Sequence, residues 1–142
     1  MTGGKDMTVD TFDPNASNAP IDAALFDDIC RCAARLHAAV AGGEVLPLTQ
    51  AEVTRYATVA CHPDWADQAR GVISSETLIQ LVRLFTLGEM QFATWVAGDQ
   101  SPVIALVREL KRREQYDPAL TRWIKAHSTN RFLPHGNLLD RL

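Results

Sequence analysis

The sequence lacks the short patterns that mark the best-known enzyme active sites. It contains no GxSxG nucleophile turn, no glycine-rich phosphate-binding loop and no HExxH zinc motif, and no helix face away from a cap carries paired carboxylates. These absences exclude the corresponding hydrolase, nucleotide-binding and peptidase motifs, though not every kind of enzyme. We therefore expect no cofactor and lean towards a protein that is not an enzyme.

Cysteine is scarce, and its three copies are poorly spaced for a metal. Cys30 and Cys32 are two residues apart in a helical pattern, so their side chains point about 160° apart and cannot share one ion. Cys32 lies on an apolar stripe with Ile29 and Leu36, where it packs as a small hydrophobic residue. We expect no metal site, and an odd cysteine count without a secretory signal predicts free thiols and a cytoplasmic location.

The sequence also lacks an excess of basic residues and an uncharged apolar stretch that could span a membrane. The 142 residues include 14 Lys and Arg against 17 Asp and Glu, a net charge of −3 that disfavours a dedicated nucleic-acid binder. The longest apolar stretch, 74–97, contains Arg83 and Glu89, whose burial in a bilayer would be costly. The sequence therefore predicts a soluble protein with no membrane partner.

Apolar residues recur with helical periodicity, without a convincing strand or internal repeat. We expect an all-α fold, a compact bundle of five to six helices in a single domain spanning 19–142. Residues 1–18 show no periodicity and are rich in Gly, Asp, Asn, Ser and Pro, which predicts a flexible, disordered N-terminal arm.

The stretch 75–97 is expected to form the central helix of the bundle. Apolar side chains cover most of its circumference, and its polar side chains fall in one narrow stripe. Glu89 lies away from that stripe, which predicts a buried or half-buried carboxylate with a cationic or hydrogen-bonding partner, or with a raised pKa. The candidates for that partner are Arg35, His37, Arg108 and Arg122.

Capping signals predict where most helices begin. The first helix is expected from Pro20 to Ala41, with Asn18 or Ala19 as its cap. Capping motifs also precede three later helices: the Thr49–Glu52 capping box, Ser101-Pro102, and Asp117-Pro118 before a helix that ends near His127. A further short helix is expected over 63–70. The short connection 98–101 predicts an antiparallel hairpin of the helices 75–97 and 102–115.

The C-terminal third concentrates positive charge and ends in an apolar-rich tail. Its candidate binding residues are Arg108, Lys111, Arg112, Arg122, Arg131, Phe132, Leu133 and His135. The basic run is either a solvated helix face or a docking patch for an acidic partner, for RNA or for the chain's own acidic arm. The apolar tail residues are expected to cover either the protein's own core or a partner.

Residues 48–71 resemble a helix-turn-helix that begins Leu-Thr-Gln. Val59 falls where the turn requires an apolar side chain, but Thr58 replaces the usual turn glycine. The second helix of this degenerate motif carries Asp64 and Asp67, which DNA phosphates would repel. The resemblance implies a nucleic-acid-binding regulator, whereas a plain helical hairpin explains the same residues.

Arg122 and His127 show the R-x4-H spacing found in a class of small helical ribonucleases, the HEPN domains. The resemblance covers six residues, and Trp123 replaces the polar residue usual after the arginine. It implies that Arg122 and His127 act together on a phosphodiester. A histidine in the last turn of a helix is also explained as a favourable charge at the negative end of the helix dipole.

The sequence favours a small, soluble, non-enzymatic helical adaptor or regulatory protein. It would act by protein–protein interaction through its basic, apolar-tailed C-terminal third, with another protein or a second copy in a homodimer as its partner. The alternatives are a nucleic-acid-binding regulator with a degenerate helix-turn-helix at 48–71 and a HEPN-like ribonuclease that uses Arg122 and His127.

Overall fold

The computed structural model describes residues 21–71, 74–98 and 101–129, and the expected arm at 1–18 lies outside these ranges. The described residues form seven α-helices and one 3-10 helix and contain no strand, which confirms the predicted all-α class. In chain order the elements are α2 (Ala23–Arg35), α3 (His37–Ala41), α4 (Gln50–Ala60), α5 (Trp65–Arg70), α6 (Ser75–Gln91), η2 (Ala93–Trp95), α7 (Pro102–Arg112) and α8 (Pro118–His127). No helix of this described part is long and apolar enough to cross a membrane.

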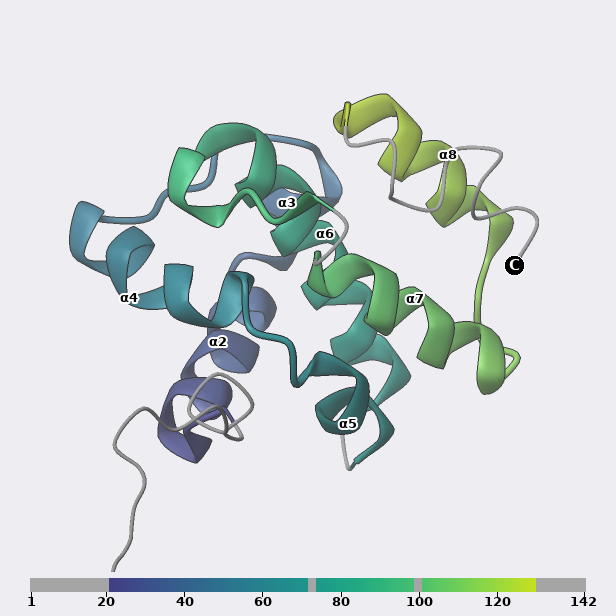
Figure 1. The fold of residues 1–142 in the computed structure, drawn as a ribbon. Coiled ribbons are helices and arrows are strands. Elements are labelled where there is room, and N and C mark those ends of the chain that lie inside the picture. Colours follow the sequence, from purple (N-terminus) through teal and green to yellow (C-terminus); the bar gives the residue numbers. More distant parts are fainter. Residues whose placement is uncertain (1–20, 72–73, 99–100, 130–142) are drawn as a thin grey trace, which may run out of the picture.

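Helix α6 packs against more elements than any other helix described. It contacts α2, α3, η2, α7 and α8, and Figure 1 shows it between α2 and α4 on one side and α7 and α8 on the other. Leu78, Leu81, Leu84 and Phe85 are fully buried on it. An apolar helix of this kind is stable only when neighbouring helices remove its surface from water.

Helices α6 and α7 run antiparallel, as predicted. Ser101, the cap of α7, contacts Glu89 near the end of α6. Arg113, just after α7, donates a hydrogen bond to Ser75 at the start of α6, over 3.3 Å. Contacts at both ends fix the direction of the two helices, and Leu106 and Leu110 of α7 are completely buried.

The predicted helix over 75–97 ends earlier than expected. Helix α6 stops at Gln91, Phe92 has an extended backbone with φ −126° and ψ 114°, and η2 follows. The indole N–H of Trp95 donates to the carbonyl of Val53 in α4 over 2.9 Å. The helix ends because this long-range contact turns Trp95 back towards α4, which the local pattern does not reveal.

The predicted first helix also differs, both at its start and in its middle. Helix α2 begins at Ala23 and not at Pro20, and its cap is Asp22, whose carboxylate accepts from the Leu25 amide over 3.2 Å. Leu36, with φ −98° and ψ 14°, leaves helical geometry and separates α2 from α3. This break is one reason why the described helices outnumber the five or six that the sequence predicts.

The local capping predictions are confirmed. Thr49 and Glu52 form a reciprocal capping box at the start of α4. Ser101 and Asp117 each accept a backbone N–H and are followed by proline at the first helical position. The short helix at 63–70 is observed as α5, two residues shorter at its start.

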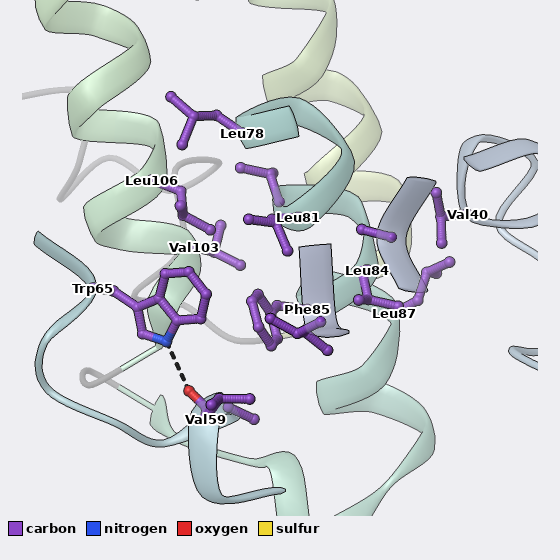
Figure 2. Packing of buried hydrophobic residues seen from close by; sticks show 14 of the residues in the cluster. Val40, Val59, Trp65, Leu78, Leu81, Leu84, Phe85, Leu87, Val103 and Leu106 are labelled. Atoms are coloured by element: carbon purple, nitrogen blue, oxygen red, sulfur yellow. Dashed lines mark hydrogen bonds between the residues drawn. The ribbon is translucent and has the colours of Figure 1, made fainter. Parts of the chain in front are cut away.

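The core contains a row of aromatic rings beside the leucines of α6. Trp65 of α5 meets Phe85 edge to face at a centroid distance of 5.2 Å, and Phe85 meets Trp95 at 5.9 Å. Figure 2 shows Trp65 beside Phe85 and the hydrogen bond from its indole N–H to the carbonyl of Val59, which is 2.7 Å long. These bonds satisfy buried polar groups, so the rings can bury their full area.

Candidate functional site

Three cations of the predicted binding set lie on the exposed face of α7. Arg112 is paired with Glu109 through two hydrogen bonds of 2.9 and 2.5 Å. The Lys111 ammonium lies 5.2 Å from the ring centroid of Tyr116. Arg108 is exposed and has neither a hydrogen bond nor an ion pair through its side chain within 21–71, 74–98 and 101–129. Lys111 likewise has no ion pair in these ranges, so Arg108 and Lys111 are the cations of this face that are available to a partner.

A cleft between α5 and α7 lies beside Arg108. Its volume is about 320 Å³, and its lining includes Arg70, Arg108 and Arg112. Ile104 and Ala105 of α7 add apolar wall. Glu109 also lines the cleft. Arg112 is paired with Glu109 and Arg70 with Asp67, so Arg108 supplies the positive charge of the lining that no carboxylate neutralises. The cleft thus combines a net positive charge with apolar surface.

Glu109 organises this end of α7 and is almost fully covered, with its side chain 4% exposed. Besides the Arg112 bonds, it accepts from Arg113 Nε over 2.8 Å. Hydrogen bonds from Arg112 above all, together with those from Arg113 and against the effect of burial, lower the pKa of Glu109 from 4.5 to about 2. Arg113 also donates to the carbonyl of Ala69 over 2.9 Å, which ties α5 to α7. Part of the basic run therefore holds the cleft together.

Arg70 and Glu109 are charged residues of this cleft that the sequence analysis missed. Glu109 precedes Arg112 and Arg113 by three and four residues, the spacings at which helical side chains meet. That spacing could have identified the cluster. Arg70 could not be found in this way, because it belongs to another helix and is brought to α7 only by tertiary packing.

The predicted burial of Glu89 is confirmed, since this residue is 7% exposed. It accepts a hydrogen bond from the hydroxyl of Ser101, which also accepts from the Val103 amide over 3.2 Å. The predicted hydrogen-bonding partner is therefore present, but it is Ser101 and not one of the candidate arginines or His37. Arg35, one of the candidate partners of Glu89, instead forms an ion pair with Glu52 at 3.4 Å. The Glu89 contact fixes the start of α7, and with it the cleft.

His127 lies against the end of α3. Its Nδ1 is 2.7 Å from the carbonyl oxygen of Trp123, and the two rings are stacked with centroids 4.4 Å apart. A Cβ added to Gly43 would lie 2.2 Å from His127 Nε2, so the ring occupies the space that this glycine leaves. Arg122 is exposed. Both ring nitrogens of His127 therefore face protein atoms, which leaves little room for a phosphodiester.

The segment that resembles a helix-turn-helix forms α4 and α5. Helix α5 has six residues, fewer than two turns, and it buries Trp65 and Ala69 in the protein core. Asp67 on it forms an ion pair with Arg70. Ala66 and Arg70 of α5 line the α7 cleft, which takes up part of the surface that would face the major groove of DNA.

The three cysteines are free, with Cys32 buried, Cys30 half-buried and Cys61 exposed. Burial, helped by the charge of Asp27, raises the pKa of Cys30 to about 11. Burial and Glu89 also raise the pKa of Cys61. Thiols with raised pKa values are poor nucleophiles and poor metal ligands. No group of three His, Cys, Asp or Glu residues in the described ranges is placed to hold a metal ion.

The predicted tail residues Arg131, Phe132, Leu133 and His135 lie outside the described residues.

The cleft between α5 and α7 can receive an anionic group next to an apolar side chain. Comparison of the chain with protein-family models, with curated proteins and with solved structures finds no match.

Proposed function

We propose that this chain is a cytoplasmic, non-enzymatic adaptor or regulatory protein that binds an acidic segment of another protein. The binding surface comprises the α5–α7 cleft and the exposed face of α7, with Arg108, Lys111 and Arg112 as its cations. The observation that supports this most is Arg108, an exposed cation without a carboxylate partner in the described part of the chain, beside a cleft that two further arginines line.

Arg108 differs from the arginines on the other side of the molecule. On α2, Arg31 pairs with Asp27 at 3.0 Å and Arg35 with Glu52 at 3.4 Å. These pairs already neutralise their cations, although exposed pairs contribute little to stability. A carboxylate brought to Arg108 would gain a charge-assisted hydrogen bond without breaking an existing pair.

The chemistry of the cleft favours a peptide over a nucleic acid. Pro63, Ile104 and Ala105 give it apolar walls that suit the side chain of a peptide. Its volume of about 320 Å³ is near the lower end of the range for ligand pockets and suits one or two side chains. The net charge of −3 and the Glu109 carboxylate in the cleft disfavour a nucleic acid, which carries a charge at every phosphate, more than a peptide that carries a few carboxylates.

Comparative affinity capture from the native cell tests this proposal. Three baits are needed: the wild-type chain, Arg108→Glu, and the control Arg31→Glu, which reverses a cation whose side chain is 79% exposed on α2. We expect one or more acidic proteins to be recovered with wild type and Arg31→Glu and lost with Arg108→Glu. Recovery that is equal for all three baits contradicts the proposal.

A second copy of the chain is the other partner to consider. Size-exclusion chromatography with light scattering of the same three proteins separates this case from binding to a different protein. If the acidic partner is a second copy, wild type runs as a dimer and Arg108→Glu runs as a monomer. If the partner is another protein, all three variants have the same mass and only the capture experiment distinguishes them.

A further inference from the structure

Arg83, in the middle of α6, has an unsatisfied guanidinium. Its Nε is buried and has no hydrogen-bond partner. No ion pair or hydrogen bond of its side chain occurs among the described residues. Arginine carries five N–H donors, and a buried donor without an acceptor is costly to maintain. Such a group in a folded protein calls for an explanation.

An aromatic ring holds the Arg83 guanidinium in place. Its central carbon lies 5.7 Å from the ring centroid of Trp123 on α8. The Trp123 indole N–H donates to the carbonyl of Ala41 over 3.0 Å, and the His127 ring stacks on Trp123. The ring is thus fixed between α3 and α8. Stacking uses only the face of a guanidinium and leaves the N–H groups at its edge free to bind an acceptor.

Arg83 also lines a cavity of about 390 Å³ between α3 and α6. Val40 and Ile79 supply apolar lining, whereas Gln80 and Gln115 supply amide groups. The volume falls within the range of small-molecule pockets, which combine apolar walls with a few polar groups. Because Nε is covered, the terminal amino groups of Arg83 are the donors that a ligand in this cavity would reach.

We propose that this cavity binds a small organic carboxylate. The carboxylate is held by the terminal amino groups of Arg83, and the apolar part of the ligand lies against Val40 and Ile79. The charged groups that line the cavity favour a singly charged ligand over a phosphate, because one arginine, Arg83, shares the lining with one carboxylate, Glu76. Among the described residues that line it, His37 is the only other titratable one. This site is separate from the α5–α7 cleft and does not depend on the function proposed for it.

Titration of the full chain with benzoate tests this proposal. Benzoate has one carboxylate and a ring that fits an apolar wall. We follow the arginine Nε–H signals in ¹H–¹⁵N NMR spectra and the heat of binding by calorimetry. We expect a saturable shift of the Arg83 signal with a dissociation constant of about 1 mM or tighter. A wild-type protein that shows no saturable shift and no heat contradicts the proposal.

Two variants and a control assign the effect to Arg83. Arg83→Gln should weaken benzoate binding about tenfold or more, because it removes a charge-assisted hydrogen bond. Arg83→Lys keeps the charge but loses the fork of donors, and should bind with intermediate affinity. Arg31→Gln, which removes an exposed cation of α2, should bind as wild type does. Binding by Arg83→Gln as tight as wild type, or loss of binding in Arg31→Gln, overturns the assignment.

Discussion

Gly88 and Trp95 are in such close contact that a side chain at position 88 has no space. A Cβ added to Gly88 would lie 2.1 Å from Cε3 of Trp95 and 2.4 Å from Cζ3. The indole therefore lies directly on the backbone of α6, while its N–H reaches the carbonyl of Val53. This contact reverses the chain after α6. Ser101, at the start of α7, then meets Glu89 near the end of α6.

Substitution of Gly88 tests this contact. We expect Gly88→Ala to lower the free energy of unfolding by about 1–3 kcal/mol, because the methyl group overlaps a fully buried ring that cannot move away. Urea denaturation measures the change. Gly42→Ala is the matched control, since its Cβ would meet chiefly the flexible Glu44 side chain at 3.2 Å. Equal stability of wild type and Gly88→Ala would show that the indole is not held on α6.

Leu106 tests the packing of α7 on α6. It is completely buried in the core, so Leu106→Ala should reduce the free energy of unfolding by about 2–5 kcal/mol. Thermal denaturation followed by circular dichroism gives the change in melting temperature. An unchanged melting temperature would rule out the packing of these two helices as described.

The Glu109 cluster predicts a loss of stability in acid. The arginines lower the pKa of Glu109 from 4.5 to about 2 in the folded protein, so the folded state binds this proton less readily than the unfolded chain. Its contribution is therefore complete above pH 4.5 and disappears as the pH falls towards about 2. We expect Glu109→Gln to be less stable than wild type at neutral pH, and the difference to shrink below pH 4.5.

Denaturant unfolding of both proteins at a series of pH values between 6 and 2.5 (about the accessible range) measures this difference. Glu114→Gln, which changes an exposed carboxylate in the following turn, is the control and should follow the wild-type curve. A constant difference between wild type and Glu109→Gln across the series would mean that the ion pairs with Arg112 and Arg113 do not stabilise the fold.

His127 is predicted to hold α8 against α3. His127→Ala removes the ring that lies over Gly43 and stacks on Trp123, so amide hydrogens of α8 should exchange faster with solvent. Hydrogen–deuterium exchange measured by mass spectrometry reports this, with Arg122→Ala on the exposed face of α8 as control. Loss of RNA cleavage in His127→Ala without faster exchange would instead support the ribonuclease interpretation of these two residues.

The features that the sequence predicted correctly depend on neighbours in the chain. The Thr49–Glu52 box and the Ser101 and Asp117 caps involve residues within three positions of each other, and all form as expected. The burial of Glu89 followed from helical periodicity alone.

The features that the sequence did not predict depend on contacts between distant segments. Helix α6 ends at Gln91 because Trp95 bonds to Val53, which lies 42 positions earlier. Arg70 reaches the α7 cleft only because α5 packs against α7. Periodicity describes one helix at a time, so neither the end of α6 nor the composition of the cleft can be inferred from it.

The central claim, that an acidic segment binds at Arg108, is tested most directly by fluorescence anisotropy with a labelled peptide of alternating glutamate and leucine. We predict saturable binding to wild type that weakens with added salt, as expected for exposed charges. Arg108→Glu should weaken this binding about tenfold or more, since it replaces an attraction by a repulsion, while Arg31→Glu should bind as wild type does. Equal affinity of wild type and Arg108→Glu would contradict the claim.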